Sequence, residues 1–241
     1  MALPLYLAMT GKEIACQALP ERLAYMACHF SPYGEGLCDF PPGLPKGSML
    51  ILDDRIPVWR HDPVRVAEQL AELIQEYGCS GCLLDFQRPV TAQAIQIVRA
   101  VNQALPCPVA VTEHYAEGSS CAVFLAAPGP NKPLRDIAAK WAGRELWLEA
   151  ALETVQYTLD KGGNRREPIP YRLPDVPFHR HEGLCCTYHM DISQTQAVFT
   201  ISRTPEDVEH LLAQAEELGF AQAVGLYQQL GVSSIAACHP E

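Results

Sequence analysis

Short runs rich in β-branched and other apolar residues recur along this chain, and several of them are separated by segments with helical periodicity. Parallel strands need long crossover connections, which are usually helices, so the alternation predicts an α/β fold built on parallel strands. Eight strands are expected, the number that closes a TIM-like (β/α)8 barrel. Their predicted ranges are 3–9, 23–30, 49–53, 82–86, 109–113, 122–126, 145–150 and 221–227.

Three connections combine helical periodicity with a capping residue at the start, namely Asp62, Thr91 or Thr204. They predict helices over 63–77, 92–104 and 205–218. Weaker helical patterns cover 11–19 and 133–142. The connections after the second and fifth strands are too short or too rich in proline for a full helix. The barrel is therefore expected to be irregular.

The alternation stops over 151–203, where strand-like pieces follow one another without an intervening helix. These pieces are 154–159, 169–173, 185–189 and 197–202, with a turn-like segment at 160–164. We predict a single barrel domain over 1–241 with a β-rich insertion at 151–203, between strand seven and the last helix. A separate C-terminal domain is the alternative. The helix and strand within 205–227 favour the insertion, because they complete an eighth βα unit.

Charge and composition exclude several classes of protein. The chain has 18 Lys and Arg residues and 28 Asp and Glu residues, which gives a net charge of −10. This charge, with no basic cluster, argues against a nucleic-acid partner. No run of 18 uncharged apolar residues occurs, so no membrane span is expected. The 10 cysteines lie mostly inside apolar segments, as at Cys28, which favours a reducing cytoplasm over a disulfide framework. The oligomeric state stays open.

The fourth predicted strand and its end carry two polar residues in register. Side chains alternate along a strand, so one face carries Leu83, Asp85 and Gln87 and the other carries Cys82, Leu84 and Phe86. Asp85 and Gln87 are therefore expected to face the lumen at the C-terminal mouth, where barrel enzymes keep their chemistry. The alternative is that Asp85 only caps the next loop or pairs with Arg88.

Residues 80–87, Ser-Gly-Cys-Leu-Leu-Asp-Phe-Gln, resemble the strand-four signature D-G-x-D-x-D-x-E of family 18 glycoside hydrolases, the chitinase-like barrels. Gly81 and Asp85 match the Gly and the third Asp. Ser80, Leu83 and Gln87 stand at the first Asp, the second Asp and the Glu. The eight strands and the insertion after the seventh are also similar to that family. The resemblance implies a chitinase-like barrel and a glycan ligand.

The departures from this signature bear on the expected activity. The resemblance implies two roles for the family's signature residues. The Glu protonates the glycosidic oxygen, and the preceding Asp holds the N-acetyl group of the substrate. The amide of Gln87 has no proton to surrender as an acid. Asp85 can still accept a hydrogen bond from an acetamide or a hydroxyl. We therefore predict a non-catalytic or catalytically altered barrel that binds a small glycan or oligosaccharide, without a cofactor or a metal ion.

Other polar residues at strand ends are expected to converge on the same mouth. The predicted substrate-binding set is Asp53, Asp54, Arg88, Glu113, His114, Tyr115, Glu149 and Tyr227. An active glycosidase, or another barrel hydrolase, is the alternative function, and it would use Glu113, Glu149 or Asp53 as acid or base. Aromatic residues that could stack on sugar rings, if they do not pack in the core, are Phe30, Tyr33, Phe40, Trp59, Phe86 and Tyr115.

Four cysteines are expected at the N-terminal face of the barrel, namely Cys79, Cys82, Cys107 and Cys121. Packing in the core is the common state of unpaired cysteines, and a zinc or redox site is the alternative. The sequence has no G-x-S-x-G elbow, Walker loop or G-x-G-x-x-G fingerprint. Sequence support for a serine hydrolase, a nucleotide hydrolase or a dinucleotide enzyme is therefore missing.

Overall fold

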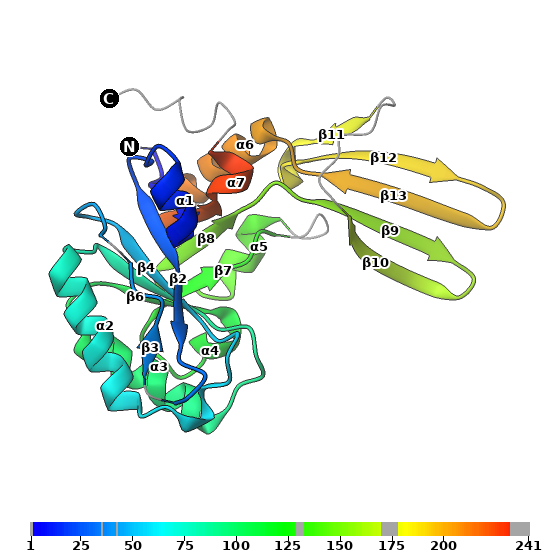
Figure 1. Ribbon diagram of the computed structural model, residues 1–241. Coiled ribbons are helices and arrows are strands. Elements are labelled where there is room, and N and C mark those ends of the chain that lie inside the picture. Colours follow the sequence, from blue (N-terminus) through cyan, green and yellow to red (C-terminus); the bar gives the residue numbers. More distant parts are fainter. Residues whose placement is uncertain (1, 35, 42, 129–132, 170–177, 232–241) are drawn as a thin grey trace.

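A closed barrel of parallel strands forms the body of the protein in the computed structural model, which describes residues 2–34, 36–41, 43–128, 133–169 and 178–231 (Figure 1). Strand β1 pairs with both β2 and β14, which closes the ring as predicted. The order around it is β1 (Leu5–Met9), β2 (Leu23–Phe30), β4 (Met49–Asp53), β5 (Gly81–Asp85), β6 (Val109–Thr112), β7 (Ala122–Leu125), β8 (Leu146–Ala150) and β14 (Gln222–Leu226).

The connections contain the three predicted long helices, and each begins at its capping residue. Asp62 accepts a hydrogen bond from the Val64 backbone N–H (2.8 Å), and Thr91 and Thr204 cap in the same way. The helices are α1 (Gly11–Cys16), α2 (Pro63–Tyr77), α3 (Ala92–Ala104), α4 (Glu113–Ala116), α5 (Leu134–Ala139), α6 (Pro205–Glu217) and α7 (Tyr227–Leu230). Short 3-10 turns are found at η1 (Val58–Arg60) and η2 (Glu182–Leu184).

The barrel is irregular where the sequence predicts it. Strand β2 is followed by the short antiparallel strand β3 (Leu37–Cys38), and β6 is followed only by the single turn α4. Two predicted strand ends are corrected, because Glu113 opens α4 and Tyr227 opens α7. In the described part of the chain, no helix has both the length and the apolar character needed to cross a bilayer.

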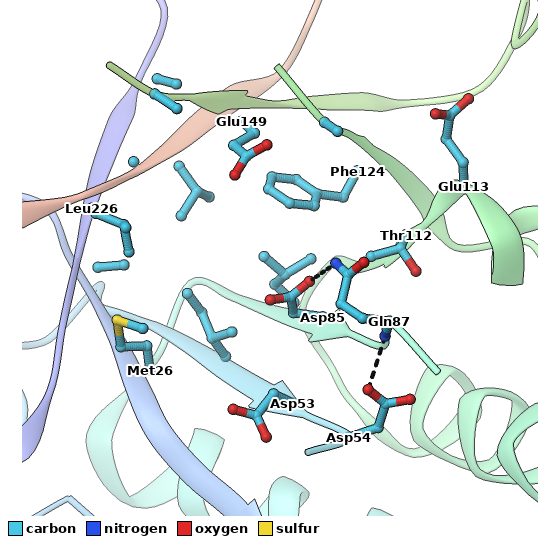
Figure 2. Close-up of a pocket in the computed structure, with 18 of the residues that line it drawn as sticks. Met26, Asp53, Asp54, Asp85, Gln87, Thr112, Glu113, Phe124, Glu149 and Leu226 are labelled. Atoms are coloured by element: carbon cyan, nitrogen blue, oxygen red, sulfur yellow. Dashed lines mark hydrogen bonds between the residues drawn. The ribbon is translucent and has the colours of Figure 1, made fainter. Parts of the chain in front are cut away.

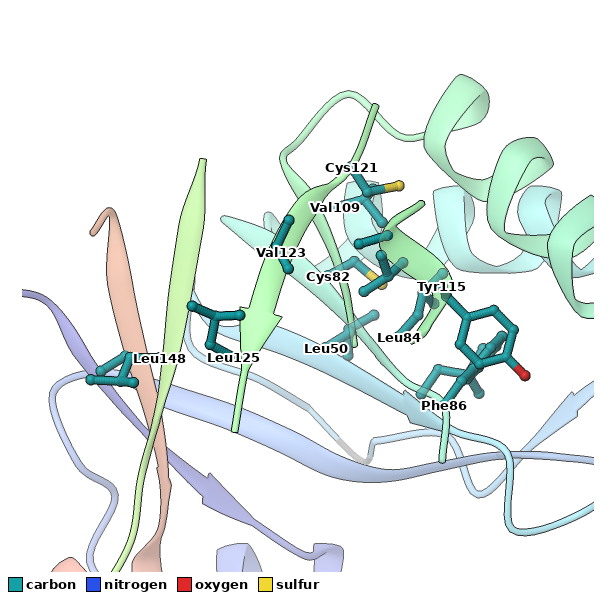
Figure 3. Packing of buried hydrophobic residues seen from close by; sticks show 14 of the residues in the cluster. Leu50, Cys82, Leu84, Phe86, Val109, Tyr115, Cys121, Val123, Leu125 and Leu148 are labelled. Carbon is teal, nitrogen blue, oxygen red and sulfur yellow. The ribbon is translucent and has the colours of Figure 1, made fainter. Parts of the chain in front are cut away.

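Strand parity divides the buried side chains between two layers. Leu83 and the fully buried Trp147 lie in the lumen layer, whereas Leu84 lies in the outer layer between the strands and the helices. Figure 3 shows part of the outer layer, with Cys82, Leu84 and Phe86 on one side of β5. At Gly81 a side-chain carbon would lie 3.1 Å from the Trp147 ring. The lumen is thus filled at the N-terminal end of the barrel.

In its described residues, the predicted insertion forms a five-stranded antiparallel sheet that projects from the barrel between β8 and α6 (Figure 1). In order across the sheet, the strands are β10 (Gly163–Ile169), β9 (Thr154–Asp160), β13 (Gln196–Ser202), β12 (Cys186–Ile192) and β11 (His179–His181). The strand predicted at 169–173 lies outside the described residues except for Ile169, at which β10 ends, and the sequence does not predict a strand over the rest of β10. Its exposed sequence Gly-Asn-Arg-Arg-Glu-Pro lacks the apolar alternation that identifies a strand.

Two buried charged residues attach this sheet to the barrel. Arg203 is 3% exposed, and its guanidinium donates to the carbonyls of Cys185 (3.2 Å) and Pro128 (2.7 Å). Asp207 of α6 accepts hydrogen bonds from Thr187 of β12 (3.0 Å) and from the Thr204 backbone N–H (3.0 Å). These bonds fix the base of the insertion near the C-terminal end of β8.

Candidate functional site

A cavity of about 560 Å³ opens at the C-terminal end of the barrel, above the lumen layer (Figure 2). Its apolar floor includes Ile51, Leu83, Phe124 and Val224, and small residues such as Ala8 and Gly225 leave it open. The volume falls within the range of about 300–1,000 Å³ typical of small-molecule pockets. The predicted site residues that line it are Asp53, Asp54, Asp85, Gln87, Arg88, Glu113, His114 and Glu149.

The end of β5 is held by Asp54, whose carboxylate acts as a clamp on the backbone. Asp54 is 4% exposed and accepts hydrogen bonds from the backbone N–H groups of Gln87 (2.8 Å) and Arg88 (3.0 Å). The Arg88 guanidinium donates to the carbonyls of Asp54 (2.7 Å) and Arg55 (2.6 Å), so it does not serve as the partner of Asp85. These bonds fix the backbone at Gln87, two residues beyond the end of β5.

Gln87 and Asp85 contact each other inside the cavity. The Nε2 of Gln87 donates to Oδ1 of Asp85 across 2.6 Å (Figure 2). Burial raises the pKa of the Asp85 carboxyl, the hydrogen bond from Gln87 opposes this increase, and the negative charges of Asp53 and Asp54 add to it. Asp85 is thus a desolvated carboxyl with one oxygen occupied by an amide.

Glu149, at the end of β8, is the second carboxyl directed into the cavity (Figure 2). One of its oxygens accepts a hydrogen bond from the Ala127 backbone N–H (3.0 Å). Burial raises the pKa of Glu149, the Ala127 bond lowers it, and the nearby charge of Asp85 raises it. A carboxyl that retains its proton to higher pH is what a general acid requires.

The other two candidate acids have partners that restrict them. Both oxygens of Asp53 are engaged, one 3.2 Å from Nδ1 of His29 and the other 3.1 Å from Nε of Arg55. Glu113 accepts a hydrogen bond from the Trp141 indole (3.2 Å), and Figure 2 shows it at the edge of the site with its carboxyl directed away from Asp85. Glu149 is therefore the candidate best placed to act as an acid.

The structure places the two predicted tyrosines away from the cavity. Tyr115 is 4% exposed and packs edge-on against Phe86 (5.5 Å between ring centroids) in the outer layer, with its hydroxyl donating to the Arg88 carbonyl (3.1 Å). Strand β6 ends at Thr112, so the side chains of α4 no longer alternate between the lumen and the outer layer. Tyr227 starts α7 and is likewise not part of the lining.

Three polar lining residues are missing from the sequence prediction: Arg55, Thr112 and Gln229. Arg55 directly follows the Asp53-Asp54 pair, which is a signal that could have identified it. Thr112 ends β6 with its hydroxyl donating to the Phe86 carbonyl (2.6 Å). Gln229 lies in α7, where its side-chain oxygen accepts from the Leu152 N–H (3.1 Å), and no sequence pattern indicates this position.

The cysteines form a packed cluster. Cys82 is fully buried, and burial together with the nearby Cys107, Cys28, Cys79 and Cys121 raises its pKa. A thiol of raised pKa is a poor nucleophile and a poor metal ligand. Within the described ranges, no group of three or more His, Cys, Asp or Glu side chains is arranged to hold a metal ion.

No protein-family model and no curated protein matches the sequence. Comparison with solved structures shows that the present structure is similar to the family 18 N-acetylglucosaminidase of Paenibacillus barengoltzii. The TM-score is 0.65, and the identity is 10% over 98% of each chain. The chain has the fold of the family 18 glycoside hydrolases. It is also similar to the chitinase of Cycas revoluta solved with (GlcNAc)3, with a TM-score of 0.60 and 12% identity over 98% of this chain and 97% of that chain.

A third similar structure is the spore cortex-lytic enzyme SleL of Bacillus cereus, with a TM-score of 0.60 and 11% identity. The match covers 96% of this chain and 71% of that one. Identities this low establish a shared fold and leave the activity to be argued from the residues of the site.

Proposed function

We propose that the protein binds a small glycan or oligosaccharide in the barrel mouth and does not cleave it by the family 18 mechanism. The observation that carries this proposal is the contact between Gln87 and Asp85, 2.6 Å long, at the end of β5. An amide there can donate a hydrogen bond to a glycosidic oxygen but cannot transfer a proton to it. General acid assistance typically contributes about 10²–10⁴-fold in rate, so its loss removes most family-type turnover.

The cavity offers the groups that a sugar needs. Phe124 and Leu83 supply an apolar surface for the C–H face of a ring, and the second oxygens of Asp85 and Glu149 can accept hydroxyl or amide hydrogens. The Cycas revoluta chitinase of the same fold was solved with (GlcNAc)3. Oligomers of N-acetylglucosamine are therefore the first ligands to test.

The test is a glycan array with the pure protein, followed by calorimetry on the soluble oligosaccharides that bind. The same protein and a Gln87→Ala variant are assayed with fluorogenic glycosides. We expect binding without hydrolysis by the wild type, and weaker binding by the variant because Gln87 lines the cavity. Hydrolysis by the wild type that survives Gln87→Ala would contradict the non-catalytic proposal. Failure to bind any glycan would remove the sugar hypothesis.

A second candidate is an active glycosidase in which Glu149 is the acid. The observation that favours it is the burial of Glu149 in the cavity, which raises its pKa, together with the negative charge of Asp85 nearby. A Glu149→Gln variant separates the two functions. It abolishes hydrolysis if Glu149 is the acid, and it changes only binding if the protein is a glycan binder.

A further inference from the structure

One face of the insertion sheet is apolar across its three central strands. The register between β9, β13 and β12 settles which side chains share a face, because side chains alternate along a strand. On the opposite face, the same strands place polar side chains and a single valine, Val198. The side chains of the first face, here called the apolar face, stand in three rows: Val155, Ile201 and Tyr188; Tyr157, Phe199 and Met190; and Leu159, Ala197 and Ile192.

The apolar face lies apart from the core of the barrel. In the described part of the chain, none of its side chains belongs to the apolar clusters of the barrel or lines the cavity. Exposure increases toward the tip of the sheet: Val155 is 2% exposed, Met190 41% and Ile192 69%. Figure 1 shows the hairpins β9–β10 and β12–β13 extending beyond the barrel. One face of an antiparallel sheet normally packs against a core, so an apolar face left open marks a contact surface.

The edges of the sheet do not favour a contact between strands. The edge strand β10 carries Arg165, Arg166 and Pro168 on an exposed segment. Charged residues and proline on an edge strand discourage pairing with another chain, because a proline has no backbone N–H and charges resist desolvation. At the other edge, β11 has only three residues. A partner therefore meets the face of the sheet and not its edge.

The size of the apolar face matches that of a small protein interface. The sheet is five strands wide, and four of its strands have seven residues each. At about 4.8 Å between strands and about 3.4 Å per residue, such a face has a flat area of roughly 500 Å². Two faces packed together cover roughly 1,000 Å², which is the lower limit for a specific interface. A second sheet of the same size is a fitting cover, since two sheets pack face to face in β-sandwiches.

We propose that the apolar face is the interface of a two-fold homodimer, in which the insertion sheets of two copies pack face to face. A second copy supplies a face of matching size and character, and the two-fold dimer is the commonest symmetric assembly. Because the barrel lies at one end of the sheet, a two-fold axis perpendicular to the strands places the two barrels at opposite ends (Figure 1). The middle row of each copy, centred on Phe199, then packs against the same row of the other. The proposal does not depend on glycan binding, since the apolar face is separate from the cavity.

The experiment is sedimentation equilibrium of the whole protein, from micromolar to millimolar concentration, on wild type, Met190→Lys and Ile192→Lys. The matched control is Gln196→Lys, which adds the same charge at an exposed position on the opposite face of the sheet. We expect the wild type to dimerise, and each variant of the apolar face to weaken the dimer at least about tenfold, because the added ammonium is buried between the sheets. Gln196→Lys should dimerise like the wild type.

Salt provides a second readout. Each copy has a net charge of −10, so two copies repel each other, and salt screens this repulsion. A dimer held by apolar contacts should become tighter as the salt concentration rises, whereas a dimer held by ion pairs becomes weaker. Weakening by salt would therefore contradict an interface formed by the apolar face.

The remaining outcomes are equally decisive. A wild type that stays monomeric over the whole range overturns the proposal, and so does a dimer that Met190→Lys and Ile192→Lys leave intact. An equal loss in Gln196→Lys assigns the effect to charge and not to the apolar face, which also overturns it. Urea unfolding of each variant checks that it is folded. Ile192 keeps the test valid if Met190→Lys is unstable, because its side chain is mostly exposed in the single chain.

Discussion

The side-chain amide of Gln87 donates to Oδ1 of Asp85 across 2.6 Å, and this contact sets the chemistry available in the cavity. An amide N–H needs an acceptor, so the contact favours the ionised form of Asp85 against the effect of burial. Two carboxyls at the same distance would instead share a proton. An amide at position 87 can therefore only donate or accept hydrogen bonds, whereas a carboxyl there can also exchange a proton with a ligand.

The clamp formed by Asp54 should be essential for this arrangement. Asp54→Asn replaces one acceptor oxygen with an amide that donates, which leaves the N–H of Gln87 or Arg88 without a partner. We expect a loss of about 1–3 kcal/mol in the free energy of unfolding, and weaker glycan binding, because an unpaired buried donor carries its desolvation cost. Urea unfolding and calorimetry measure the two effects.

The control for this substitution is Asp62→Asn. Asp62 accepts a single backbone hydrogen bond as the N-cap of α2, and Asn caps a helix about as well as Asp. The free energy of unfolding of the Asp62→Asn variant should stay within about 0.5 kcal/mol of the wild type. Equal effects of the two substitutions would show that the Asp54 clamp has no special role.

Glu149→Gln should alter how stability depends on pH. Because the pKa of Glu149 in the folded protein lies above its ordinary value of 4.5, the folded state binds this proton more tightly than the unfolded state. The buried group costs nothing while it is protonated in both states, and it destabilises the fold as pH rises above the ordinary pKa. Gln can still accept from the Ala127 N–H. The variant should therefore gain stability relative to wild type as pH rises from about 4 to about 8.

Urea unfolding of both proteins across this pH range tests the prediction. Glu72→Gln, on an exposed position of α2, controls for the removal of a carboxyl from the surface. A difference between wild type and Glu149→Gln that does not change with pH, or that falls as pH rises, would show that Glu149 is not a desolvated carboxyl.

Gly225 is expected to tolerate no side chain. A Cβ at this position would lie 2.6 Å from the Ala150 carbonyl oxygen on the neighbouring strand β8, and it would also meet Leu230. Gly225→Ala should cost about 1–3 kcal/mol in unfolding free energy, since two paired strands cannot separate locally. Gly43→Ala, where nothing lies within 4 Å, is the control and should be close to neutral in the same urea titration. Comparable stability of the two variants would contradict this account.

The sequence predicts the barrel because its signals are local. Asp62 and Thr204 mark helix starts that depend only on neighbouring backbone groups. Strand parity correctly assigns Leu83 to the lumen layer and Leu84 to the outer layer, because alternation is a property of the extended backbone itself. The closing pair β1 and β14 follows once the barrel is assumed, since an eighth strand has no other edge to join.

The predictions about the site are weaker where they depend on the residue at which a strand ends. The alternation of side chains along a strand does not continue into the helices α4 and α7. An assignment based on it therefore places Tyr115 and Tyr227 in the cavity, which they do not line. The partners of Asp53 and Glu113 come from His29 and Trp141, on segments distant in the sequence. Strand β10 is missed for a different reason: its side chains are exposed and thus show no apolar pattern.

Restoring the acid is the most direct change to the chemistry of the cavity. Gln87→Glu places a second carboxyl in contact with Asp85, and repulsion between the two raises the pKa of the pair, which is the direction an acid requires. We expect weak turnover of soluble chitooligosaccharides, below that of an active family 18 enzyme. Leu83 is expected to limit the gain, because the resemblance to the family 18 signature implies an Asp at this position that assists the next Asp, matched here by Asp85, through its protonation cycle.

Adding Leu83→Asp to Gln87→Glu should raise turnover further, but at a cost in stability. Leu83 is 2% exposed and packs in the apolar lumen layer with Ile51 and Phe124, so a carboxyl there is desolvated. The double variant should therefore unfold at lower urea than the single one, and a parallel Leu83→Ala variant separates loss of packing from the added charge. The measurement is a side-by-side assay of wild type and the variants on soluble chitooligosaccharides, with binding followed by calorimetry. If Gln87→Glu binds the oligosaccharide as tightly as wild type and still gives no product, alone or with Leu83→Asp, then Gln87 does not occupy the position of the acid.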